Sequence, residues 1–241
     1  MFKTNTSLKF SVLILLIIVH STSAFAQKAT VQSPDGKVKV SIFLANGIPE
    51  YEVTYADEFF LERSALGLVT NRADYSKALR FEEAQPFQND TSYTQQKIKK
   101  YEINYKYNGL LCSFSNEAGQ LLNVRFQVDN NNVGYRYEIP AFGETIAVVV
   151  EKEMTTFNFP KEATSFLTPQ SESMVGFRRS KPSYEEGYEV DQNISEKSQF
   201  GHGYTFPALF KIGERGWTLI SETGVRGLYC GSHLSDPSQD G

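Results

Sequence analysis

The feature that most constrains the fold is an alternation of apolar and polar residues that returns along most of the chain. Its first clear occurrence spans residues 38 to 44, with apolar side chains at Val38, Val40, Ile42 and Leu44. This two-residue period is that of a β-strand buried mainly on one face. Turn sequences flank it at 34–36 and 46–47, where Gly and Asn accept positive φ at little cost. Because residues 51–55 repeat the alternation, the chain is predicted to open as a β-meander.

The middle of the chain repeats this pattern at near-regular spacing. Apolar residues alternate within 101–107, 110–114, 124–128 and 133–139, and turn-forming clusters stand at 116–119 and 129–132. No segment after residue 26 has a helical stripe over three turns. The 18 Phe and 13 Tyr suit the gap between two stacked sheets. The pattern predicts an all-β fold, a large β-sandwich with long irregular loops.

The segment from Phe159 to Gly203 differs, because it is rich in Ser, Pro, Glu and Gly and has no sustained period. We expect a long irregular loop there, and such loops in compact domains are usually functional or cover something. After it, residues 209–212 and 217–220 flank Gly213-Glu214-Arg215-Gly216 and predict one more hairpin.

Residues 1–26 have the three parts of a secretory signal peptide. Lys3 and Lys9 supply a basic start, an apolar run spans 10–19, and Ala24-Phe25-Ala26 precedes Gln27. The apolar run is too short for the roughly 20 residues that span a bilayer. No cysteine follows the small residues, so a lipid anchor at that point is not indicated. We expect cleavage before Gln27 and export of residues 27–241 as a soluble domain without membrane attachment.

Charge and cysteine content exclude several classes of function. The chain has a net charge of −4, and loss of Lys3 and Lys9 makes it more negative, which disfavours a nucleic-acid partner. Cys112 and Cys230 are the only cysteines, so a disulfide and two separate buried thiols both stay open. The three histidines are scattered, so no zinc or redox-metal site is predicted.

Chemical motifs are few. The sequence has no Gly-x-Ser-x-Gly elbow, no phosphate-binding glycine loop and no strand–helix repeat. Residues 129–134 resemble the start of a calcium loop, but Val133 and Pro140 stand where oxygen ligands are required, so a hairpin turn is predicted. Clustered carboxylates remain as candidates, either as a solvated acidic loop or as ligands for a hard cation such as calcium. They are Glu185, Glu186, Glu189 and Asp191, beside Tyr184 and Tyr188.

Several short motifs, taken in order, resemble the N-terminal domain of glycoside hydrolase family 97, which comprises exported bacterial α-glucosidases and α-galactosidases. The matching stretches are 33–36, 47–55, 64–68, 133–140, Tyr184-Glu185-Glu186-Gly187-Tyr188 and 217–224. The resemblance covers nearly all of residues 27–241. It implies a galactose-mutarotase-like super-sandwich that precedes a catalytic (β/α)8 barrel, which this chain would lack.

The resemblance also implies a site. In the family the sandwich gives one glutamate to a calcium ion (Ca2+) at the active site of the barrel, and by the motif that residue is Glu185, with Glu186 one position away. The acid and base carboxylates belong to the barrel, so we expect no catalytic residue in this chain. The implied partners are the barrel and an oligosaccharide, an α-glucan or α-galactoside, and the expected location is the periplasm, with the extracellular space as the alternative.

Two other functions stay open on the sequence. One is a stand-alone carbohydrate-binding module that stacks sugars on exposed aromatic rings, with Tyr184, Tyr188 and Trp217 as candidates. A lone Trp in a strand belongs to the core more often than to such a platform, so Trp217 is expected to be buried. The other is a purely structural domain without a ligand.

Overall fold

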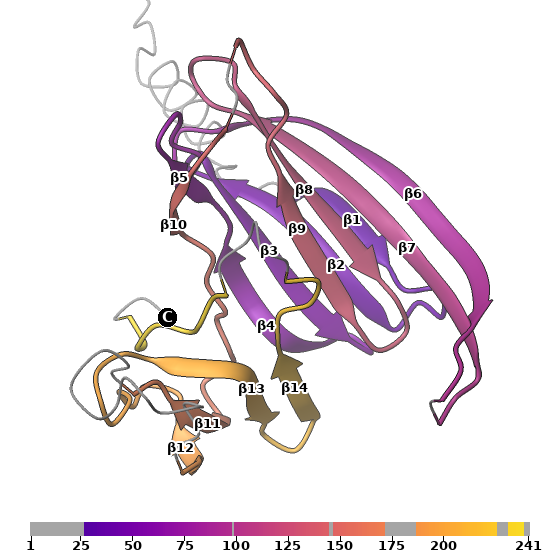
Figure 1. Cartoon of the computed structure of the whole chain (residues 1–241), viewed down its shortest axis with the longest axis vertical. Helices are drawn as coiled ribbons and strands as arrows, with labels where there is room; N and C mark the ends of the chain where they lie inside the picture. Colours follow the sequence, from indigo (N-terminus) through magenta and orange to yellow (C-terminus); the bar gives the residue numbers. More distant parts are fainter. Residues whose placement is uncertain (1–26, 98, 145–146, 172–186, 226–230, 239–241) are drawn as a thin grey trace, which may run out of the picture.

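The computed structural model describes residues 27–97, 99–144, 147–171, 187–225 and 231–238 (Figure 1). The predicted signal peptide and Glu185 lie outside these residues. The described part is built from β-strands, without a helix, and it contains no helix that could serve as a membrane span. The all-β prediction is confirmed. The strands are β1 (Gln27–Gln32), β2 (Val38–Ala45), β3 (Ile48–Tyr55), β4 (Glu58–Ala65), β5 (Leu68–Thr70), β6 (Arg80–Thr94), β7 (Glu102–Ser115), β8 (Leu121–Val128), β9 (Val133–Glu138), β10 (Val150–Glu153), β11 (Ala163–Pro169), β12 (Glu189–Asn193), β13 (Tyr204–Ile212) and β14 (Gly216–Ile220).

Two four-stranded antiparallel sheets form the sandwich. The first has the order β1-β2-β3-β4 and the second β6-β7-β8-β9, and Figure 1 shows them stacked face to face. Hydrogen bonds join their ends, from the Asn108 side-chain amide to the Gln32 carbonyl (2.8 Å) and from the Asp35 N–H to the Asn130 side chain (3.1 Å). Strands β5 and β10 make a separate two-stranded sheet.

The core between the two sheets is rich in aromatic rings. Phe126 of β8 is fully buried, and its ring centroid lies 6.1 Å from that of Tyr51 in the facing sheet and 5.9 Å from that of Tyr135 on β9. Burial raises the pKa of Tyr51, Tyr135 and Tyr137 above that of free tyrosine. The Tyr137 hydroxyl accepts a hydrogen bond from the Gly67 N–H (2.9 Å) and lies 2.7 Å from the Thr155 hydroxyl.

The predicted opening meander is confirmed, with one correction to its burial. Strand β2 is covered on both faces, because Phe43 and Ser41 are buried as well as Val40 and Ile42. The Arg63 guanidinium covers Phe43, with its carbon 3.9 Å from the ring centroid. Long arginine side chains cover apolar surface in this way while the charge stays near water.

The turn at Asp129 is confirmed as a hairpin turn. It joins β8 to β9, and the Asp129 carboxylate accepts hydrogen bonds from the N–H groups of Asn131 (2.8 Å) and Asn132 (2.7 Å). The carboxylate therefore holds its own loop. This is the Asx-type turn that Asp commonly forms with the backbone two residues on.

The predicted irregular loop from Phe159 to Gly203 is wrong in part, since β11 and β12 lie inside it. The inward residues of β11 are Ala163, Ser165 and Leu167, of which two are small and one is polar. Its apolar alternation was therefore weak in the sequence. The predicted hairpin after it is confirmed as β13 and β14, and all four strands form a third sheet in the order β12-β11-β13-β14.

Cys112 is a free thiol in the sandwich core, fully buried on β7. Burial raises its pKa to about 12, because the apolar surroundings disfavour the thiolate. Cys230 lies outside the described residues. Cys112 thus packs as a small apolar residue of the core. This agrees with the hypothesis of separate buried thiols.

Candidate functional site

The third sheet has one face that belongs to the core. Its inward side chains join the same buried cluster as the sandwich, and the Phe159 and Phe210 rings stack at 4.0 Å between centroids. The buried inward residues are Ala163, Ser165, Leu167, Ala208, Phe210 and Ile212. Alternation along each strand then sends the residues between them to the opposite, outer face.

The outer face carries a row of apolar side chains beside polar residues such as Lys211. Strand register aligns one row across all four strands, composed of Leu219, Leu209, Phe166 and Val190. Trp217 stands beside this row, with its ring centroid 5.1 Å from that of Phe166. Trp217 is 52% exposed, Leu219 62% and Val190 57%. We call Phe166, Val190, Leu209, Trp217 and Leu219 the apolar row; a contiguous exposed surface of this kind marks an interaction site more often than scattered apolar residues do.

Two expectations about aromatic residues are tested here. The expectation that Trp217 is buried is wrong, because Gly216, Thr218 and Ile220 are the inward positions of β14 and Trp217 alternates outward. Tyr188 is 68% exposed, as a platform residue would be. Tyr184 lies outside the described residues.

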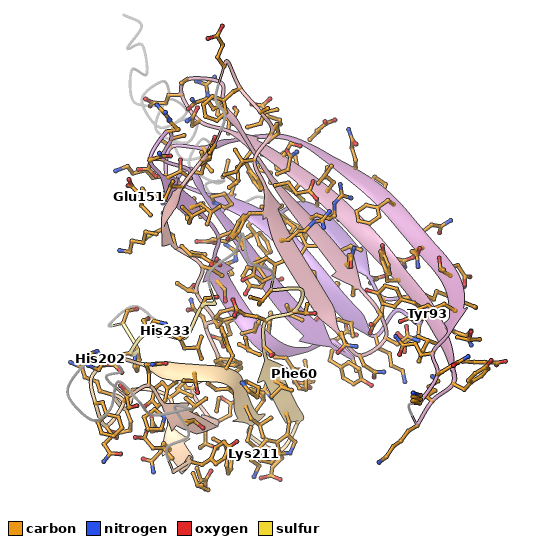
Figure 2. The ribbon with its side chains drawn as sticks, viewed as in Figure 1. Phe60, Tyr93, Glu151, His202, Lys211 and His233 are labelled. Atoms are coloured by element: carbon orange, nitrogen blue, oxygen red, sulfur yellow. The ribbon has the colours of Figure 1, made fainter. Side chains whose placement is uncertain are left out.

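The sheet is fastened to the sandwich through the turn between β13 and β14. The Arg215 guanidinium donates to the Phe59 carbonyl (3.0 Å), pairs with Glu58 at 3.8 Å and bonds to Glu162. Figure 2 places Phe60 at this junction, next to the turn, and Lys211 on the neighbouring strand. Arg215 therefore links the third sheet to β4 of the first sheet.

The last described segment of the chain lies against the third sheet. Tyr204 and Leu234 form a β-bridge, with N–H to carbonyl distances of 2.8 and 2.9 Å in the two directions. Figure 2 shows His202 and His233 at this same end of the sheet, although they are far apart in the sequence. Burial tends to raise the pKa of Asp236, but hydrogen bonds from Ser198 and the charge of Lys197 together leave the pKa below its usual value.

The structure can locate only part of the predicted acidic cluster. Glu185 and Glu186 lie outside the described residues. Glu189 opens β12 and accepts a hydrogen bond from the Gln199 N–H (3.2 Å), and Asp191 is exposed with a positive φ of 57°. Within the described ranges, no three His, Cys, Asp or Glu residues are arranged to hold a metal ion.

Within the part of the chain that the structure describes, the carboxyl groups give no sign of an acid–base pair. Among those with a resolved shift in the described part, only Glu50 has a raised pKa, caused by burial and opposed by Arg63, whose guanidinium lies 3.8 Å away. Glycoside hydrolysis takes two carboxyl groups about 5 to 9.5 Å apart across the bond. The apolar row, in contrast, is suited to binding another surface.

The described residues thus form an all-β sandwich with an attached third sheet that carries the apolar row on its outer face. The model of the family "Glycosyl-hydrolase 97 N-terminal" matches residues 31–241, and the chain belongs to this family. The resemblance to this family in the sequence motifs is confirmed. No curated protein matches the chain.

Solved structures of the family give the same picture. A β-arabinopyranosidase is 46% identical with a TM-score of 0.84, over 88% of this chain and 34% of that chain. A family 97 enzyme from Pseudoalteromonas sp. strain K8, in complex with acarbose, is 27% identical with a TM-score of 0.55, over 58% of this chain and 22% of that one. A variant of that enzyme in complex with panose, at 24% identity and a TM-score of 0.62 over 76% of this chain and 27% of that one, shares the fold. The chain thus spans about a third or less of these relatives.

Proposed function

We propose that this chain is the N-terminal domain of an exported, calcium-dependent α-glycosidase, and that it supports and lines the active site of a separate catalytic barrel. The observation that carries the proposal is the exposure of the apolar row. The chain corresponds to only 34% of the length of the β-arabinopyranosidase to which it is 46% identical. A face that is 52 to 62% exposed at Trp217, Val190 and Leu219 would be stabilised by burial against a second domain. The same domain would be exported through the signal peptide at residues 1–26, to the periplasm.

The substrate class has two candidates. The family resemblance favours an α-glucoside or α-galactoside, and the relative bound to acarbose agrees with an oligosaccharide partner. The β-arabinopyranosidase has the higher identity, 46%, and supports a β-arabinopyranoside instead. In either case we expect the catalytic carboxylates to belong to the rest of the enzyme, so the reaction would require the complete protein.

A chimera tests the proposal. Residues 27–241 replace the matching N-terminal part of the β-arabinopyranosidase, and hydrolysis of an aryl β-arabinopyranoside is measured. We expect the chimera to retain activity within about tenfold of the parent and the catalytic part without any N-terminal domain to fall well below it, because misplacement of a supporting surface by about 1 Å can cost a factor near one hundred. A soluble, folded chimera no more active than the catalytic part alone would contradict the proposal.

The calcium ligand is tested in the same chimera. Ca2+ takes 6 to 8 oxygen ligands, so one carboxylate in an isolated domain holds it weakly, at roughly millimolar affinity. We expect Glu185→Gln to weaken calcium binding and activity together, by about tenfold or more, since the negative charge and one carboxylate oxygen are lost. Calorimetry with CaCl2 and rate measurements provide the readout.

Glu186→Gln is the matched control, because it removes the same charge one position away. The proposal predicts a much smaller effect for it. The reverse ranking would move the ligand to Glu186, and equal, negligible effects of both changes would show that the acidic segment is a solvated surface.

A further inference from the structure

A second exposed surface lies on the outer face of sheet β6-β7-β8-β9, the face that points away from the core. Outward positions of an antiparallel sheet that faces water are ordinarily polar. Here strand β7 sends Tyr105 and Tyr107 outward, and the neighbouring edge strand β6 adds Phe87. Tyr105 is 40% exposed. We call these three rings the aromatic platform.

The rings of the platform are held in place by one another. The Phe87 and Tyr107 centroids are 6.2 Å apart in an edge-to-face arrangement, and those of Tyr105 and Tyr107 are 4.9 Å apart. Gly109 makes room for them, since a Cβ built there would lie 2.2 Å from Cζ of Phe87. The ring of Phe87 therefore fills the space that any other residue at 109 would need.

Polar side chains fix the platform at its border. Gln127 on β8 accepts a hydrogen bond from the Tyr105 hydroxyl and donates one to the Tyr107 hydroxyl, both at 3.3 Å. The Arg125 guanidinium carbon lies 4.9 Å from the Phe87 centroid and is fixed by Glu138, with Nε to Oε1 at 2.7 Å. Because these contacts hold the rings and the amide in place before a ligand arrives, the side chains would lose little conformational entropy when it binds.

The aromatic platform differs from the apolar row in the chemistry of its side chains. The apolar row is largely aliphatic, as protein interfaces often are, whereas the platform combines aromatic rings with an amide and a paired guanidinium. The C–H face of a pyranose ring packs against an aromatic ring, whose face is electron-rich, while its hydroxyl groups need planar donors and acceptors nearby. Glu138 binds both Arg125 and Arg136 and offsets one of their two positive charges.

We propose that the aromatic platform of Phe87, Tyr105 and Tyr107 binds a neutral polysaccharide by stacking on its pyranose rings. This surface is separate from the apolar row, because β6 and β7 belong to a different sheet from the strands of the row. Figure 2 shows Tyr93 of β6 well away from Lys211 of the third sheet. The binding would hold an exported protein on its polymer and does not depend on the proposed catalytic partner.

Affinity electrophoresis of the purified chain tests the proposal, in gels that contain arabinogalactan or pullulan. We expect at least one of these neutral polymers to retard the protein, and Tyr105→Ala to weaken the apparent affinity about tenfold, the loss expected for one stacked ring. Tyr105→Phe keeps the ring and should retain most of the binding. Retardation should persist in about 0.5 M NaCl, because screening does not act on a neutral ligand.

Tyr188→Ala is the matched control, since Tyr188 is an exposed tyrosine, 68% accessible, at the third sheet. Circular dichroism and the melting temperature verify that each variant is folded. The proposal is overturned if neither polymer retards the wild-type chain, if Tyr188→Ala and not Tyr105→Ala abolishes retardation, or if only anionic polygalacturonate binds.

Discussion

Phe126→Ala is expected to lower the free energy of unfolding by about 3 to 5 kcal/mol, the usual cost of deleting a buried Phe ring. Phe126 has no exposed surface and contacts Tyr51 in the facing sheet and Tyr135 on the next strand. The substitution would leave a cavity between the two sheets, where rigid aromatic neighbours cannot collapse to fill it. Urea unfolding of the purified chain, followed by circular dichroism, measures the loss.

Phe59→Ala is the control for that experiment, because Phe59 is 42% exposed on β4. Exposed positions away from special contacts usually change stability by no more than about 0.5 kcal/mol. A loss below about 1 kcal/mol for Phe126→Ala would show that the two sheets do not share the core described above.

Introducing charge into the apolar row is expected to have the largest effect on function. In the chimera with the β-arabinopyranosidase, the double change Trp217→Glu and Leu219→Glu should lower activity by about a hundredfold or more, because two carboxylates would be buried against an apolar surface without partners. In the chain alone the same change should alter the melting temperature little, since both side chains are more than half exposed. Aryl-glycoside hydrolysis and thermal unfolding provide the two measurements.

The matched control is Tyr93→Glu with Tyr101→Glu, which adds the same two charges to exposed aromatic positions on the β6–β7 hairpin of the second sheet. Activity on the small aryl substrate should not change, because these residues lie away from the third sheet. Equal losses for the two double variants would point to general destabilisation and contradict a docking role for the apolar row.

Much of the fold could be read from the sequence because the sandwich strands alternate cleanly. Strands β2, β3 and β8 each have a buried set of alternating apolar residues and β9 has a partly buried one, and the alternation predicted all four strands. Strand β6 (Arg80–Thr94) did not stand out, since it is an edge strand with mostly exposed residues and a proline at Pro86. Proline is tolerated at an edge, where its missing N–H removes no central hydrogen bond.

The candidate surfaces were harder to predict. In β14 both phases contain apolar residues, Trp217 and Leu219 outward and Ile220 inward, so periodicity could not say which side faces the core. That ambiguity is itself the signal of a strand with two apolar faces, and it could have indicated a docking surface. The role of Glu185 came from family resemblance and stays a prediction.

The central claim is that the apolar row of the third sheet is covered by the catalytic part of a complete enzyme. Hydroxyl-radical footprinting with mass spectrometry tests it, because Trp217 is the only Trp in this chain and is 52% exposed. We expect Trp217 to be oxidised readily in the chain alone and at least about tenfold more slowly in the active chimera, while Tyr93, 45% exposed on the second sheet, is modified equally in both. Equal oxidation of Trp217 in the two proteins, with the chimera active, would contradict the account.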